Sequence, residues 1–228
     1  MLRCITSFGP EGWKTYAPQF LETWPEIPIT VYVEQEEKYP QRAHITYKSA
    51  WSVPHFMEWA EAAPDPDDWA HNMRKWCRKI WIILHCLENY DGEIWWIDAD
   101  TEWSAAPKLE GLMEDKYIAW MERASMHPCT SVIGFNTLHE DNWRFINDYK
   151  ETMLSGSVYR LDEWHDAYIT KAIVDFNQIA VKNIAPPISP ADVTAAFEGD
   201  AEGVRKINIF EATFPEGIHS KGPVRKAA

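Results

Sequence analysis

The sequence has few cysteines and little positive charge, and both shortages exclude whole classes of protein. Its four cysteines, in 228 residues, form no Cys-x-x-Cys pair, so neither a disulfide framework nor a zinc knuckle is expected. We interpret them as small buried side chains. The 35 acidic residues outnumber the 22 basic ones, and the resulting charge of −13 opposes non-specific contact with nucleic acid or an anionic membrane.

Long apolar runs are also absent. No stretch approaches the roughly 20 apolar residues that a transmembrane helix needs. The N-terminus lacks the charged and apolar segments of a secretory signal peptide. These absences predict a cytoplasmic protein without a membrane span. With 46% hydrophobic residues, the length fits one large domain over residues 1–228 better than two domains.

Tryptophan, by contrast, is abundant, with 13 copies. Large aromatic side chains fill hydrophobic cores, and their faces also stack on sugar rings. We expect most of these residues in the core and a few beside an acidic site.

That acidic site follows an apolar run, residues 94–97, which ends in two carboxylates, Asp98 and Asp100. The run is aromatic or β-branched without polar alternation and follows the turn at 90–92, which predicts a short strand buried on both faces. Ligands of open α/β sheets bind at the carboxyl ends of strands, where two oxygen ligands suit a divalent cation bound with substrate phosphates. The alternative is an ordinary Asp-rich turn.

The remaining pattern predicts an α/β fold. Residues 3–8, 13–23 and 29–34 read as strand, helix and strand, with Pro18 delaying or kinking the helix, and this order opens a parallel sheet. Further helices are expected at 53–62, 71–89, 109–113, 143–154 and from 161 to 174, and further strands at 117–121 and 130–136. Residues 35–70 and the segment after 183 read as less regular.

Taken together, these features resemble glycosyltransferases of the GT-A fold, in particular small phage or bacterial members. The resemblance rests on Thr6-Ser7-Phe8, Glu34, the basic helix before Trp96-Ile-Asp-Ala-Asp100, Gly134-Phe-Asn136, Leu161-Asp-Glu-Trp-His-Asp166 and His219-x-x-Gly222-x-x-Arg225. It implies a single, Rossmann-related α/β domain with a mixed, mostly parallel sheet flanked by helices. Residues 1–135 would bind a nucleotide sugar, and residues 136–228 would supply the acceptor site and a C-terminal tail.

The resemblance also implies a metal site. Asp98, Asp100 and His219 would bind Mn²⁺ or Mg²⁺, which bridges the diphosphate of a nucleotide sugar, with a UDP-sugar favoured. Arg225 stands where Lys is usual in the His-x-x-Gly-x-x-Lys pattern, so the charge is kept while the phosphate contact differs. The other residues implied in donor binding are Thr6, Ser7, Phe8, Glu34, Lys79, Lys221 and Gly222.

The acceptor hydroxyl needs a carboxylate to take its proton if the reaction inverts the anomeric carbon. Asp166 and Glu163 are the candidates, followed by Asp162. Trp164 is either a sugar platform or a core residue, and Asn136 is a candidate substrate contact.

Residues 161–166 have a second interpretation. They also suit an acidic N-terminal turn stabilised by the helix dipole. In either case His165 is expected to be structural, because consecutive helix positions face different directions.

The sequence therefore predicts a metal-dependent glycosyltransferase that acts on a hydroxyl of a glycan, a protein or a modified nucleobase. The net charge of −13 counts against a large DNA footprint. One alternative is a non-catalytic carbohydrate-binding protein, for which the tryptophans suffice. Another is a haloacid-dehalogenase-like phosphatase, but that family carries Thr or Val where Glu102 stands, and its acid pair lies near the N-terminus.

Overall fold

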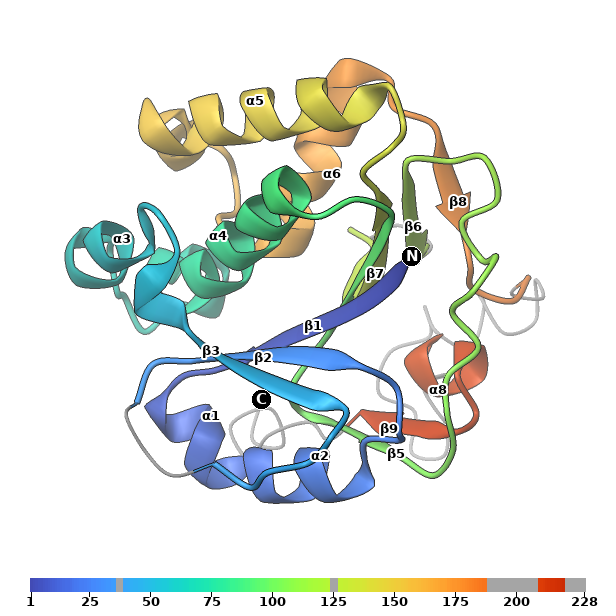
Figure 1. The fold of residues 1–228 in the computed structure, drawn as a ribbon. Helices are drawn as coiled ribbons and strands as arrows, with labels where there is room; N and C mark the ends of the chain where they lie inside the picture. The colour runs from blue at the N-terminus through green and yellow to red at the C-terminus, as the bar shows by residue number, and fades with distance from the viewer. Residues whose placement is uncertain (36–38, 124–126, 188–208, 220–228) are drawn as a thin grey trace, which may run out of the picture.

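The inner strands of the central sheet are buried along most of their length, and its two edge strands are more polar and more exposed. The computed structural model describes residues 1–35, 39–123, 127–187 and 209–219, and in them seven strands form one mixed sheet (Figure 1). Their order across the sheet is β3 (Ile45–Ser49), β2 (Ile29–Val33), β1 (Leu2–Phe8), β4 (Glu93–Ile97), β7 (Cys129–Asn136), β6 (Ile118–Met121) and β8 (Val181–Asn183). Strand β7 runs antiparallel to β4 and β6, and the other neighbours are parallel, so the predicted α/β class with a mostly parallel sheet is confirmed.

Strand β4 shows why its sequence carries no polar alternation. Ile94 and Trp96 pack in the core on one face of the sheet, whereas Trp95 and Ile97 pack in the core on the other face. All four side chains are buried. A strand covered on both faces needs apolar residues at every position.

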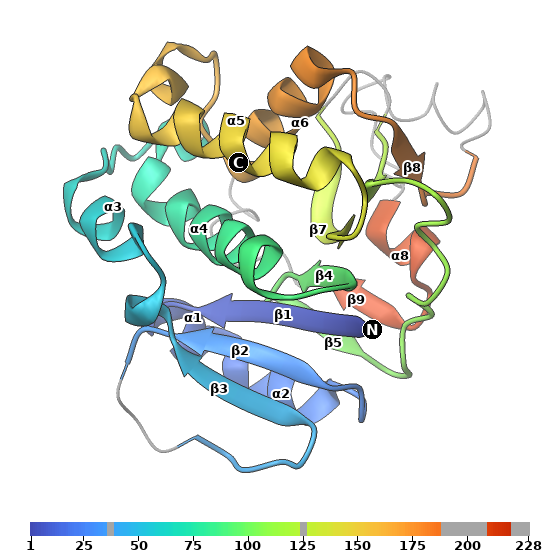
Figure 2. The same ribbon diagram turned by 45° about the horizontal axis from the view of Figure 1, so that its top comes forward.

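Helices cover both faces of the sheet (Figure 2). Helix α4 (Met73–Asn89) crosses one face together with α3 (Phe56–Ala62), α5 (Asp141–Leu154) and α6 (Asp166–Asn177). The other face carries α1 (Pro10–Thr15), α2 (Ala17–Thr23) and α8 (Ile209–Thr213). Single 3₁₀ turns lie at Ala50–Ser52, Trp69–His71 and Ser157–Arg160. Among the described helices, none has the length and apolar character needed to cross a lipid bilayer.

A second, two-stranded sheet lies beside the end of β4. Strand β5 (Thr101–Trp103) pairs antiparallel with β9 (Gly217–His219), with Thr101 opposite His219. This pairing brings a late part of the chain next to the acidic turn that follows β4.

Several helices and strands predicted from the sequence differ from those in the structure. Pro18 falls in the first turn of α2, where a missing backbone N–H is tolerated, so the expected helix is two short helices. The predicted helix at 109–113 is wrong: these residues form turns, and the left-handed backbone of Gly111 and Glu114 interrupts any helix there. Strand β3 lies in the segment that reads as irregular.

Gly134 offers a test of the packing around β4. It pairs with Trp95, and a Cβ atom at position 134 would lie 2.8 Å from three atoms of the Trp95 ring. We therefore expect Gly134→Ala to destabilise the protein by about 1–3 kcal/mol in denaturant unfolding.

Gly12→Ala is the matched control, because no atom of the described residues, apart from its chain neighbours and the backbone of its own helix, lies within 4 Å of a Cβ at this position in α1. It should leave stability unchanged or raise it by up to about 1 kcal/mol. Equal effects of the two substitutions would contradict the packing argument.

Candidate functional site

Asp98 is held at the end of β4 by contacts on both its backbone and its side chain. Its backbone N–H donates to the Ser131 carbonyl of β7 at 2.7 Å. Its Oδ1 accepts from Trp96 Nε1 at 2.6 Å and from Lys79 Nζ at 3.0 Å. The side chain is still 26% exposed, so the carboxylate is oriented and reaches solvent.

The turn after Asp98 is also fixed. Thr101 Oγ1 donates to the Asp98 carbonyl at 2.7 Å and accepts from Trp103 Nε1 at 3.0 Å. Asp100 lies in this turn, partly buried. The backbone of His219 lies opposite Thr101, which places this residue next to the acid pair. The three predicted metal ligands therefore come from adjacent backbone segments.

Lys79 is buried beside Asp98, whereas the resemblance implies that it contacts the donor. Its ammonium lies 3.0 Å from Asp98 Oδ1 and 2.8 Å from Asp166 Oδ2. It also donates to the carbonyl and hydroxyl of Thr130, at 2.8 and 3.2 Å. Burial alone would lower the pKa of Lys79, but the two carboxylates outweigh it and raise the pKa above its usual value. The ammonium thus stays charged.

Asp166 is the first residue of α6 and closes this network. Its Oδ2 accepts from Thr130 Oγ1 at 2.7 Å as well as from Lys79. Burial would raise the pKa of Asp166, but Lys79 and the hydrogen bonds hold it below the usual value. A buried carboxylate that is engaged in this way is unsuited to take a proton from an acceptor hydroxyl. Its position fits a residue that holds Lys79 in place.

Glu34 marks the carboxyl end of β2. Its carboxylate forms an ion pair with Arg78 of α4. The Arg78 guanidinium lies against Gly9, since a Cβ at Gly9 would be 2.3 Å from its Nη2 atom. The pair lies at the same end of the helix as Lys79. The sequence alone does not indicate Arg78 or Gly9 as site residues.

The predicted donor contacts on β1 are mostly core residues. Thr6 and Phe8 are 0% and 1% exposed, and Ser7 is 9% exposed. Phe8 packs edge-to-face against Trp13 and Phe20. The side chain of Phe8 is therefore part of the hydrophobic core.

The remaining predicted site residues are Asn136, at the end of β7, and three residues near the C-terminus. Asn136 pairs with Glu93 at the start of β4, whereas Asp98 follows its end. Five strand residues separate Asn136 from Asp98 by roughly 16 Å, so Asn136 lies away from the acid pair, and a substrate contact there stays a prediction. Lys221, Gly222 and Arg225 lie outside the described residues.

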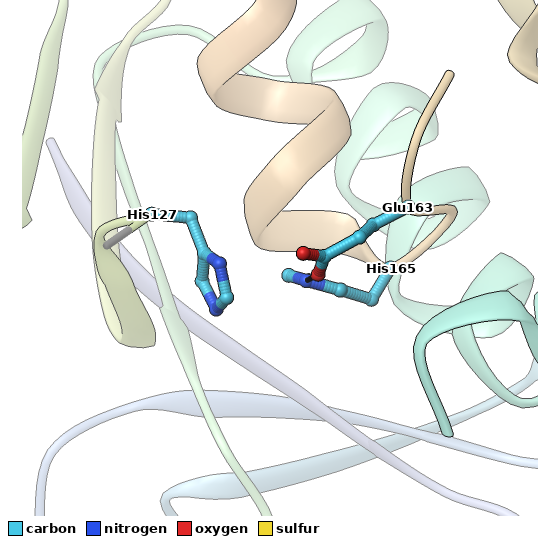
Figure 3. A group of neighbouring side chains, drawn as sticks. All are labelled: His127, Glu163 and His165. Atoms are coloured by element: carbon cyan, nitrogen blue, oxygen red, sulfur yellow. Dashed lines mark hydrogen bonds and ion pairs between the residues drawn. The ribbon is translucent and has the colours of Figure 1, made fainter. Parts of the chain in front are cut away.

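Glu163 and His165 come from the segment that leads into α6, and His127 from the loop before β7 (Figure 3). His165 caps α6, because its Nδ1 accepts from the Tyr168 N–H at 3.3 Å. Its Nε2 lies 2.7 Å from Glu163 Oε2. The His127 ring meets the His165 ring at a centroid distance of 4.3 Å.

The electrostatics of this cluster favour neutral imidazoles. Burial lowers the pKa of His165, although Asp166 and Glu163 partly oppose that effect. Burial, helped by His165 and Arg123, lowers the pKa of His127 to about 4. His165 therefore has the structural role that the sequence predicts, but as a cap before the helix rather than a residue within it.

Asp162 and Trp164 are held by neighbouring polar and aromatic groups. The Asp162 carbonyl lies 2.8 Å from His71 Nε2, and its carboxylate accepts from Tyr168 at 3.3 Å. Trp164 is partly buried and meets the rings of His71 and Tyr159 edge-to-face, each at 5.0 Å. A tryptophan in this position joins a larger group of aromatic rings between α3, α4 and α6.

The Lys79 network predicts a large effect on stability. Lys79→Met removes the buried positive charge and leaves the Asp166 carboxylate without its partner, which should cost about 3–5 kcal/mol in denaturant unfolding. The control is Lys171→Met, which breaks an exposed pair with Asp175 and should cost less than about 1 kcal/mol. Similar losses in both variants would contradict the structural role of Lys79.

Comparison with known proteins shows the fold. The chain matches no protein-family model and no curated protein sequence. A crystal structure of an active-site mutant of LgtC aligns with a TM-score of 0.51 and 13% identity over 97% of this chain and 88% of that one. The apo structure of mouse xyloside xylosyltransferase 1 aligns with a TM-score of 0.55 and 7% identity over 96% of this chain and 97% of that one. The fold of this chain is therefore that of the GT-A glycosyltransferases.

Proposed function

We propose that this protein is a metal-dependent glycosyltransferase that moves a sugar from a nucleotide-diphosphate sugar to an acceptor hydroxyl. One observation carries the proposal: the backbone pairing of β5 with β9 sets His219 beside the Asp98–Asp100 turn at the carboxyl end of β4. Ligands bind at that end of strands in open α/β sheets. The likeness to LgtC and to xyloside xylosyltransferase 1 supports the same function.

The donor set fits a divalent cation. Two carboxylates and one imidazole match the oxygen and nitrogen ligands of Mn²⁺, and the carboxylates alone match those of Mg²⁺. Asp98 meets the requirement for an oriented ligand, because Trp96 and Lys79 hold its Oδ1 while the side chain stays partly exposed. When bound, the cation would offset the negative charge that develops on the departing nucleotide diphosphate.

Other residues of the chain would support or surround the bound donor. The ammonium of Lys79 holds the Asp98 carboxylate in one orientation. The ion pair of Glu34 with Arg78 lies at the same edge of the sheet. The sequence adds Lys221 and Arg225 as cations for the diphosphate, with a UDP-sugar favoured by the resemblance.

On the acceptor side, Glu163 is the strongest of the three candidate carboxylates. Its side chain is 35% exposed, and His165 donates to Oε2 and so fixes its direction. Asp166 is buried in the Lys79 network, and Asp162 lies against Tyr168. If the reaction inverts, Glu163 takes the proton of the attacking hydroxyl, with Trp164 as the nearest aromatic platform for an acceptor sugar.

Donor binding can be tested by thermal unfolding with nucleoside diphosphates and nucleotide sugars, each with Mn²⁺, with Mg²⁺ and with EDTA. A donor at a hundred times its dissociation constant should stabilise the protein by about 2.7 kcal/mol. We expect a shift that requires both metal and one nucleotide, and its loss in Asp100→Asn.

Asp115→Asn is the control, because this exposed carboxylate pairs only locally with Lys116. It should keep the full shift. If no nucleotide shifts the unfolding temperature under any metal condition, the transferase proposal fails. Sugar binding that is insensitive to EDTA would then favour a non-catalytic carbohydrate-binding protein.

The acceptor side can be tested by comparing Glu163→Gln with Asp162→Asn. Removing the general base should lower kcat by about 10²–10⁴-fold while leaving donor binding unchanged. Release of nucleoside diphosphate, with simple sugars as acceptors, measures this. We expect the large loss in Glu163→Gln and a small one in Asp162→Asn. The reverse ranking would assign the base to Asp162.

A further inference from the structure

The cluster of His127, Glu163 and His165 uses other residues than the acid pair and has a different chemical character (Figure 3). One potential ligand atom from each of the three residues lies within 4.8 Å of the other two. We propose that this cluster binds a transition-metal cation of the zinc type, separate from the hard cation at Asp98 and Asp100. The proposal adds a second metal site to the protein and does not depend on the transferase activity. Because Glu163 is also the proposed base of the transfer, zinc bound at the cluster would occupy its carboxylate and stop it from accepting the hydroxyl proton.

The ligand types select the metal. Two imidazoles and one carboxylate are a known protein ligand set for Zn²⁺, whereas Mg²⁺ prefers oxygen ligands throughout. Three protein ligands leave a fourth position of a tetrahedral site for water or another small ligand. Solvent can reach that fourth position, because His127 is only partly buried and the Glu163 side chain is 35% exposed.

His127 is fixed from its own backbone. Arg123 donates from Nε to the His127 carbonyl at 2.9 Å and from Nη2 to the Pro128 carbonyl at 3.2 Å. One guanidinium therefore holds the peptide unit that follows His127 and the next one along the chain. The edge-to-face contact with His165 sets the ring in place.

The His165 ring is held in place by neighbouring aromatic rings. It is 1% exposed and packs against the rings of Trp69 and Trp76, at centroid distances of 4.7 and 6.1 Å. Glu163 is only two residues away and lies in hydrogen-bond contact with its Nε2 atom. The three ligands thus converge from two chain segments without any large rearrangement.

Binding requires a small and observable adjustment. Because His165 Nδ1 accepts from the Tyr168 amide, the imidazole proton lies on Nε2 and points at Glu163. A metal bound at Nε2 moves that proton to Nδ1, which frees the Tyr168 amide. The Nε2 and Oε2 atoms, 2.7 Å apart, must separate to roughly 3.3 Å for tetrahedral ligation.

The test is a calorimetric titration of the full chain with ZnCl₂ in excess Mg²⁺, which occupies the acid pair. We expect one zinc site in the wild type and a loss of affinity of at least about 100-fold in His127→Ala and in Glu163→Gln, since even outer contacts of a metal site are worth about 10–100-fold. Both substitutions keep His165, the capping residue of α6, and thermal unfolding should show both variants folded.

Two matched variants identify the site. His55→Asn removes a different histidine that lies 3.6 Å from a carboxylate, Glu58, and it suits the left-handed backbone at position 55. It should bind zinc as the wild type does, and so should Asp100→Asn. Loss of zinc in Asp100→Asn but not in His127→Ala would overturn the proposal, as would an absence of zinc binding by the wild type.

Nuclear magnetic resonance supplies a second readout. Zinc should shift the backbone amide of Tyr168 and switch the protonated nitrogen of His165, effects that a cation bound at the acid pair would not produce. An unchanged Tyr168 amide at saturating zinc would contradict ligation by His165. If the nucleotide panel fails while these zinc effects persist, the transferase proposal falls and the second metal site stands.

Discussion

The buried ammonium of Lys79 is the interaction on which the candidate site depends. It joins four elements, because Lys79 lies on α4, Asp98 follows β4, Thr130 lies on β7 and Asp166 opens α6. A charge in this position is stable only while both carboxylates remain beside it. The same contacts fix the direction of Asp98 and the point at which α6 begins. The acid pair and the His165 cap are therefore parts of one arrangement.

The reversal of strand direction at β7 makes this arrangement possible. Because β7 runs antiparallel to β4, its first residues lie beside the end of β4, and Ser131 and Thr130 reach Asp98 and Lys79. A parallel strand would place its carboxyl end there instead. The sheet thus presents oxygen atoms from two neighbouring strands at one edge, where the helices leave the carboxylates accessible.

The sequence predicts the fold well where local patterns are strong, and the site only in part. The doubly buried strand at 94–97, the helix at 71–89 and the α/β class follow from apolar spacing, which packing then preserves. The role of Asp166 does not follow, since its partner Lys79 lies far away along the chain and the sequence indicates it only as an implied donor contact. Pairings such as that of Gly9 with Arg78 depend on tertiary contacts that no local spacing encodes.

The pairing of β5 with β9 has a consequence for the order of events during folding. Thr101 and His219 are neighbours in the structure but lie far apart along the chain, so their pairing is among the non-local contacts that close late. During synthesis on the ribosome, the sheet that carries Asp98 and Asp100 can form before His219 has emerged. A nascent chain would therefore hold the acid pair before β9 pairs with β5, and the proposed donor site would be complete only in the last steps of folding.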